Sequence, residues 1–302
     1  MIVGSLQTAW TADEIAARYD VRWQPEVPAV IRDRFDAGLT QRLSESQESG
    51  SVVFDGATYA LHDYRLVVTD PVTERTRIEL LLGPTTFFEY LASNQSLLET
   101  DLRQAVARLA SPSHLGRLPL SNQLAANFSV ITSDGFFVLQ RRSNRVANFA
   151  GLLASGVNAT IQRGDRGQRG DECSDGEPDP IAAVIRECKE ELGVVVERSA
   201  VKVFGLALDH RYLQPLLVGE LLVPDTYAGL RSSAMAWARD KFEYERFEAL
   251  AVSPRSTLDS FAENRWVPVC ALTTLMSTIA RFGRDEVLRQ YCAHEGGEVQ
   301  VG

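Results

Sequence analysis

The chain has 302 residues, of which 45% are hydrophobic and 24% charged, and its formal net charge is −9. This composition is typical of globular proteins with one large or two medium domains, and it excludes collagen-like and disordered chains. The acidic balance argues against general binding to nucleic acid, which depends on clustered Lys and Arg.

No apolar run approaches the roughly 20 residues that span a bilayer, and Met1–Asp20 lacks the pattern of a signal peptide. The four cysteines form no CxxC pair and have no zinc-like spacing, so we expect reduced thiols in a cytoplasmic protein. These cysteines are Cys173, Cys188, Cys270 and Cys292. We therefore expect no nucleic-acid or membrane partner, and the sequence leaves open a monomer or a homodimer.

The first third of the chain mixes helical and extended patterns. Strands are predicted at Ser51–Phe54, Tyr64–Asp70 and Thr76–Leu82, and the last two form a hairpin around Asp70-Pro71. Helix-like segments are predicted at Ala12–Tyr19 and Val27–Leu43, from Pro84 onward, and at Leu97–Leu109.

Pro, Gly and Ser cluster in Ser111–Pro119, where we place a domain boundary. Residues 1–118 are expected to form a smaller α+β domain with a role in substrate recognition or dimerisation, and residues 119–302 a second domain. The second domain opens with a predicted hairpin, Phe128–Thr132 and Phe136–Arg141, around Ser133-Asp134-Gly135.

Further strands, helices and loops follow in mixed order, which predicts an α+β domain with helices packed over a mixed sheet. The predicted strands are Ala150–Ile161, Val194–Val196, Val201–Leu208, Leu216–Val223 and Trp266–Val269. The predicted helices are Pro180–Leu192 and Leu272–Tyr291; Tyr227–Arg239 and Lys241–Leu250 are helical or irregular, and Gln162–Asp179 is predicted to be a mobile loop.

The segment Pro180–Leu192 carries the strongest local signals. Asp179-Pro180 is a typical helix start and Gly193 a typical helix end. At about 100° per residue, one apolar stripe forms and three glutamates converge on a different face. The stripe is Ile181, Ile185, Cys188 and Leu192, and the glutamates are Glu187, Glu190 and Glu191.

Three carboxylates on one helix face repel each other unless something neutralises them. A hard dication such as Mg²⁺ or Mn²⁺ turns that repulsion into coordination, because it prefers carboxylate oxygens and retained waters. A solvated acidic face is the structural alternative for such a pattern. The ordered string from Arg186 to Val194, Arg-Glu-Cys-x-Glu-Glu-x-Gly-Val, favours the metal site, with two predicted strands before it and one directly after it.

The string from Arg186 to Val194 resembles the second half of the Nudix signature, Gly-x5-Glu-x7-Arg-Glu-U-x-Glu-Glu-x-Gly-U with U a bulky aliphatic, with Cys188 at the first aliphatic position. The first half departs from it: Glu172 stands at the glycine position and Pro178 at the glutamate position. Gly176-Glu177 lies one residue too early, so a one-residue insertion would restore the motif.

The resemblance implies a Nudix α/β/α sandwich and Mg²⁺-dependent hydrolysis of a nucleoside diphosphate derivative. It implies Glu187, Glu190 and Glu191 as metal ligands and Arg186 as the residue that orients them. A further carboxylate would serve as general base. The candidates are Glu177, Glu220 and Glu245; for the last two, an ordinary surface glutamate is the favoured interpretation.

Arg77–Leu98 and Leu120–Leu124 resemble the branch of the family that contains UDP-glucose/UDP-galactose pyrophosphatase. This implies cleavage of a UDP-sugar to UMP and sugar 1-phosphate. Arg141 and Arg142, at the end of a predicted strand, could contact phosphate or simply face solvent. Phe87, Phe88 and Tyr90 could stack on a base or pack in the core. Two alternatives remain: hydrolysis of ADP-ribose or another nucleotide, and a nucleotide-binding or regulatory module with little or no turnover.

Overall fold

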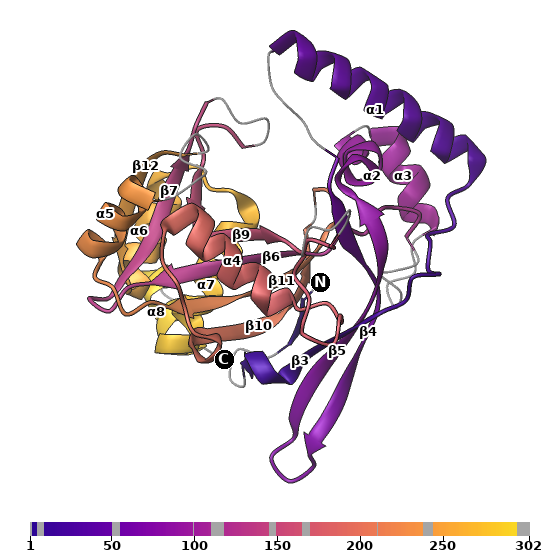
Figure 1. The fold of residues 1–302 in the computed structure, drawn as a ribbon. Coiled ribbons are helices and arrows are strands. Elements are labelled where there is room, and N and C mark those ends of the chain that lie inside the picture. The colour runs from indigo at the N-terminus through magenta and orange to yellow at the C-terminus, as the bar shows by residue number, and fades with distance from the viewer. Residues whose placement is uncertain are drawn as a thin grey trace.

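Nine strands within the described part of the chain form one mixed sheet, shown in Figure 1. The computed structural model describes residues 2–4, 9–49, 55–98, 100–109, 118–144, 149–164, 170–209, 211–237 and 244–294. The main strand order is β1-β10-β11-β6-β7-β12, and β2, β8 and β9 pair with β10, β7 and β6. Among the described strand pairs of this sheet, only that of β11 with β6 is parallel. The bounds are β1 Ile2–Gly4, β2 Trp10–Thr11, β6 Ala125–Ile131, β7 Phe136–Arg142, β8 Leu153–Ser155, β9 Val157–Thr160, β10 Val201–Leu208, β11 Pro215–Leu222 and β12 Tyr244–Ala251.

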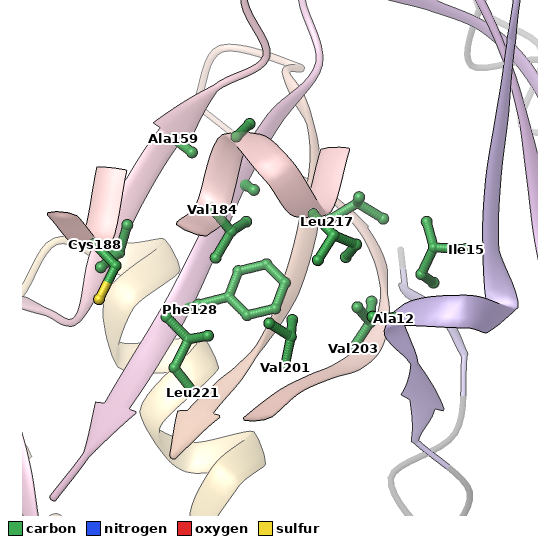
Figure 2. Close-up of a cluster of buried hydrophobic side chains, with 14 of the residues drawn as sticks. Ala12, Ile15, Phe128, Ala159, Val184, Cys188, Val201, Val203, Leu217 and Leu221 are labelled. Carbon is green, nitrogen blue, oxygen red and sulfur yellow. The ribbon is translucent and has the colours of Figure 1, made fainter. Parts of the chain in front are cut away.

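Helices cover both faces of this sheet (Figure 1). Helix α4 (Pro180–Leu192) lies on one face, and α5 (Tyr227–Trp237) packs against it. On the other face lie α6 (Pro254–Glu263), α7 (Pro268–Phe282) and α8 (Arg284–His294). Figure 2 shows Val184 and Cys188 of α4 above Phe128, Val201 and Leu221 of the sheet, all five of them buried. The expected α/β/α sandwich with a mixed sheet is confirmed.

A second sheet, in the order β3-β5-β4, lies beside the sandwich. Its strands are β3 (Ile15–Tyr19), β4 (Ala57–Asp70) and β5 (Arg75–Thr86), and it is joined by helices α1 (Ala29–Ser49), α2 (Phe87–Ala92) and α3 (Thr100–Leu109). The core does not stop between the two sheets, because Tyr59 and Leu80 belong to the same buried cluster as Phe128 and Val184. Most of the expected boundary Ser111–Pro119 lies outside the described residues, so a division at 118/119 stays a prediction.

Local signals predicted several elements well. Both hairpins are confirmed, as are the helix Pro180–Leu192 and the strand Val201–Leu208. The predicted strand Ser51–Phe54 lies outside the described residues. No helix within the described ranges is long and apolar enough to cross a bilayer.

Other predictions were wrong where tertiary contacts override local pattern. Ala12–Tyr19 is a 3₁₀ turn followed by β3, because Ile15 pairs with Ile78 and is buried. Residues 244–251 form the edge strand β12 rather than a helix. Val194–Val196 is not a strand, and Trp266–Val269 makes one bridge before Pro268 starts α7. The helix from Pro84 begins only at Phe87, since β5 continues to Thr86.

The C-terminal helical region also differs from its prediction. The expected helix Leu272–Tyr291 is two helices that meet at Gly283, whose φ of +81° is incompatible with a continuous helix. Helix α6 was not predicted at all. It begins with Ser253, whose hydroxyl oxygen accepts from the Ser256 amide, and Pro254.

Candidate active site

Helix α4 is capped by Asp179 at its N-terminus and by Gly193 at its C-terminus. The Asp179 carboxylate accepts hydrogen bonds from the amides of Ile181 and Ala182, each 3.1 Å long. Gly193 ends the helix at a φ of +69°, and a Cβ there would lie 3.1 Å from the carbonyl oxygen of Ser233 on α5. The caps determine where the helix starts and stops, and therefore where its acidic residues lie.

The buried face of α4 differs slightly from its prediction. Ile181, Cys188 and Leu192 are fully buried as expected, but Val184 takes the central position that was predicted for Ile185. Glu191 continues this row, because residues 184, 188 and 191 are four and three positions apart. Glu191 is consequently only 6% exposed, whereas Glu187 and Glu190 are half-buried.

Arg186 connects the acidic residues to the loop before the helix. Its guanidinium donates to both carboxylate oxygens of Asp171, at 2.9 Å each, and to the Thr160 carbonyl at 3.1 Å. The same group donates to Glu187 at 2.8 Å and to Glu190 at 3.0 Å. The bidentate pair with Asp171 holds the guanidinium in a well-defined orientation, and its Nη1 donates to one oxygen of each of the two glutamates.

Asp171 is a site residue that sequence analysis missed. It is 4% exposed, and besides Arg186 it accepts a 2.8 Å hydrogen bond from the amide of Gln162. The adjacent Glu172 accepts from the Tyr59 hydroxyl at 2.9 Å. Both residues lie in the predicted mobile loop, where no local pattern separates an anchored carboxylate from a solvated one. The described parts of that loop are therefore anchored to α4 and to β4.

Burial raises the pKa of Glu187 to about 7, although the charge of Arg186 beside it acts in the opposite direction. Burial and the charge of Glu191 also raise the pKa of the Cys188 thiol. The carboxylates of α4 thus lie where negative charge is poorly solvated. A bound cation would favour the ionised form of Glu187.

This shift predicts how pH changes the stability of the metal-free protein. Between pH 4.5 and about 7, Glu187 is ionised in the unfolded state but not in the folded one. Folding stability should therefore fall as pH rises through this range. In EDTA, wild type should therefore lose stability relative to Glu187→Gln as the pH rises through this range. Urea unfolding at pH 4.5, 6 and 8 measures the difference in unfolding free energy between wild type and Glu187→Gln. If this difference does not change with pH, the prediction is wrong.

The three glutamates line one cavity of about 450 Å³, here called the acidic cavity. This volume lies within the range of roughly 300–1,000 Å³ that is usual for small-molecule sites. The other residues that line it include Phe87, Tyr90, Gln123, Arg142, Phe149, Ala154, Asn158, Asp209 and Gln214. The rings of Phe87 and Tyr90 are stacked, with centroids 6.1 Å apart. The acidic cavity therefore joins α4 to two aromatic residues of the N-terminal helix α2.

Glu191 also lines a second cavity of about 280 Å³, here called the side cavity. Its other walls come from α5 and β12: Arg231, Ala234, Met235, Tyr244, Glu245, Arg246 and Phe247. Glu245 occupies a bulge in β12, since Tyr244 pairs with Arg142 and Arg246 with Arg141. A bulge turns an extra side chain out of the ladder, and here that side chain faces the cavity that Glu191 lines.

The remaining predicted residues lie in different places. Arg142 lines the acidic cavity, with its guanidinium 5.8 Å from the ring centroid of Tyr244. Arg141 points to the opposite face, where it donates to Glu248 at 2.8 Å and to Asn264 at 3.0 Å. Glu220 lies on that face too, 2% exposed and bonded to Arg281 of α7.

Glu177 lies outside both cavities. Its carboxylate accepts a 2.9 Å hydrogen bond from the amide of Tyr19, at the end of β3. The structure therefore joins Glu177 to the N-terminal sheet. It brings Glu187, Glu190, Glu191, Arg142 and Glu245 to the two cavities that share Glu191 as a lining residue.

Across the described ranges, no group of three or more His, Cys, Asp or Glu side chains is arranged around one metal position. The reason lies in Arg186, which draws Glu187 and Glu190 toward itself. The donor set nevertheless fits a hard dication, because three carboxylates on neighbouring helical turns line one polar cavity. Each carboxylate has two oxygens, so a glutamate that accepts from Arg186 with one oxygen can coordinate an ion with the other.

Comparison with known proteins gives one curated relative and several solved structures; no family model matches the sequence. The chain is 28% identical over 151 residues to uridine diphosphate glucose pyrophosphatase NUDT22 of Mus musculus. The alignment covers 50% of this chain and 44% of the mouse protein, so the chain matches less than half of that relative's length.

The solved structures are similar over about half of the chain. The MutT protein of Methanosarcina mazei Go1 is 14% identical, with 54% of this chain and 94% of that chain covered and a TM-score of 0.34. The MutT NUDIX hydrolase of Burkholderia pseudomallei is 17% identical, with 51% and 94% covered and a TM-score of 0.31.

Proposed function

We propose that this chain is a Nudix hydrolase that uses Mg²⁺ to split a UDP-sugar into UMP and sugar 1-phosphate. One observation carries the proposal: Glu187, Glu190 and Glu191 share a cavity with Arg142 and with the aromatic pair Phe87 and Tyr90. The cavity thus combines a set of carboxylate donors, a cation and a flat apolar surface. These are the groups that a divalent metal, a diphosphate and a nucleobase require.

The reaction needs an activated water and neutralisation of the diphosphate. Mg²⁺ held by the α4 glutamates, with Mn²⁺ as an alternative, would polarise the phosphoryl oxygens and lower the pKa of bound water. Arg186 would keep the glutamates oriented, and Arg142 would bind a phosphate oxygen. The water oxygen bonds to phosphorus while the bridging P–O bond breaks, which yields two monophosphates.

Glu245 is the general base that the arrangement of the two cavities supports best. The attacking water must lie close to the metal ligands, and Glu245 faces the side cavity, of which Glu191 forms a wall. The carboxylate there would accept the proton of the water. Glu177 and Glu220 are less suitable, because the first bonds to Tyr19 and the second lies on the opposite face of the sheet.

The preference for a UDP-sugar rests on two supports. The curated relative is described as a uridine diphosphate glucose pyrophosphatase. The acidic cavity also contains amide and carboxylate side chains, from Gln123, Asn158, Asp209 and Gln214, which can hydrogen-bond to uracil and to sugar hydroxyls. In this proposal the N-terminal region has the recognition role, because α2 supplies Phe87 and Tyr90.

A substrate panel tests the proposal. The purified chain is incubated with Mg²⁺ and UDP-glucose, UDP-galactose, ADP-ribose or a dinucleoside polyphosphate, and the released monophosphates are separated by chromatography. We expect UMP and sugar 1-phosphate from the UDP-sugars, and no release in EDTA. A higher kcat/KM for ADP-ribose than for the UDP-sugars would show that the proposed substrate class is wrong, while the proposed mechanism would stand.

Replacing Phe87 should weaken substrate binding more than it slows the chemical step. Stacking of a base on an aromatic ring contributes about 1–3 kcal/mol, so Phe87→Leu should raise KM for the UDP-sugar about 10-fold. Its kcat should change less than threefold. Phe88→Leu is the matched control, since Phe88 is also half-buried but lies outside the acidic cavity. Equal effects of the two variants on KM would contradict the recognition role of Phe87.

A second candidate is a nucleotide-binding module with little turnover. It is favoured by the engagement of Glu187 and Glu190 with Arg186, which leaves the carboxylates turned away from a common metal position. If UDP-glucose raises the melting temperature but no monophosphate is released with Mg²⁺ or Mn²⁺, this candidate replaces the hydrolase.

A further inference from the structure

Gln140, in the middle of β7, is a buried amide whose polar atoms are not satisfied. Its side chain is 0% exposed. Within the described part of the chain, neither its Nε2 nor its Oε1 has a hydrogen-bond partner. Buried amides in folded proteins nearly always have partners, because desolvation without a compensating hydrogen bond opposes folding. An amide left in this state therefore calls for a ligand, a water or a side chain that turns toward it.

The strand register places Gln140 between the two cavities. It pairs directly with Ala154 of β8 on one side and with Phe247 of β12 on the other. Residues directly opposite one another in a sheet point to the same face, so these three side chains form one row. Ala154 lines the acidic cavity and Phe247 lines the side cavity. Gln140 therefore lies in the sheet between one residue of each cavity, although it lines neither cavity itself.

Glu191 is common to both cavities, and it comes from the helix that covers this face of the sheet. The buried amide therefore lies on the face of the sheet that α4 covers, between residues of the two cavities that Glu191 lines. An amide offers both a donor and an acceptor, so it can bind a carboxylate and a water at the same time.

From this geometry we infer that Gln140 is a positioning residue of the hydrolytic site. With a cation held by the α4 glutamates, Gln140 Nε2 would donate to the Glu191 carboxylate and Oε1 would accept from a neighbouring water. This inference rests on the proposed function, since it assigns Gln140 a partner in the metal-loaded state. Groups that orient a metal ligand typically change metal affinity or activity about 10–100-fold when they are removed.

A comparison of stability with metal binding tests the inference. Gln140→Met keeps the length of the side chain but has no amide, and Gln140→Leu is a second apolar variant in case methionine does not fit. Ser277→Ala is the matched control, because the Ser277 hydroxyl is also buried and unpartnered but lies on α7, across the sheet from α4. The measurements are the melting temperature in EDTA, Mg²⁺ affinity by titration calorimetry with the metal alone, and kcat and KM for UDP-glucose.

We expect Gln140→Met to raise the melting temperature in EDTA by about 2–6 °C, because an unsatisfied buried amide is removed. Mg²⁺ affinity and kcat should each fall about 10-fold or more, with KM changed less than threefold. Ser277→Ala should leave metal affinity and kcat within twofold of wild type. Wild-type Mg²⁺ affinity and kcat in both Gln140 variants would overturn the inference while the proposed function stands. Failure of the wild type itself to bind Mg²⁺ and to turn over would overturn both.

Discussion

Glu191→Gln is expected to lower kcat about 10³-fold at saturating Mg²⁺ and to leave the fold intact. The glutamine has the same shape but lacks the negative charge that the proposed cation requires, and metal stabilisation of the transition state contributes several kcal/mol. Glu191 is the glutamate for which this test is sharpest. It is 6% exposed and lines both cavities, so no exposed neighbour can easily take its place.

The matched control is Glu197→Gln, six residues further along the chain. Glu197 is exposed, and its side chain makes no capping hydrogen bond to the short helix that follows. This variant should keep wild-type kcat and KM, because it removes the same charge from a place outside the site. UMP release is measured at several Mg²⁺ concentrations, and circular dichroism checks the fold. If Glu191→Gln retains more than a tenth of the wild-type kcat, the proposed metal site is wrong.

Arg186→Met is expected to have the largest effect on stability. The substitution removes the partner of Asp171, which is 4% exposed, and of the half-buried Glu187 and Glu190. Breaking a buried ion pair by removing one partner costs about 3–5 kcal/mol, and the partial exposure of Arg186 reduces this to about 2–4 kcal/mol. Turnover should fall as well, because the glutamates lose the group that orients them.

A double-mutant cycle with Asp171→Asn separates the ion pair from packing. Asp171→Asn removes the charge that Arg186 neutralises, so the double variant should be more stable than the sum of the two single losses predicts. Urea unfolding in EDTA gives the four free energies, and strict additivity would show that Asp171 and Arg186 do not act as a pair. Added Mg²⁺ should restore part of the stability of Arg186→Met, since the cation then neutralises the same glutamates.

The bounds of helix α4 could be predicted because their determinants are local. Asp179 and Gly193 specify its ends through contacts within three or four residues, and the helical period alone brings Glu187, Glu190 and Glu191 to neighbouring positions. The hairpins were predictable for the same reason, since their turns and alternating strands lie close together in the chain. The α/β/α sandwich was expected from a resemblance carried by this same helix and its flanking residues.

The surroundings of α4 could not be predicted in this way. Asp171 and Arg186 form an ion pair although they are 15 residues apart in the sequence. Gln140 pairs with Phe247 on an edge strand that local pattern predicts to be helical or irregular. Phe87, which lines the acidic cavity, comes from the N-terminal region. Such partners are chosen by strand register and by the burial of a shared core, which depend on contacts between distant segments. Local chemistry therefore identified the acidic helix. Long-range packing decided which other side chains line the two cavities, because only the assembled sheet brings them to Glu191.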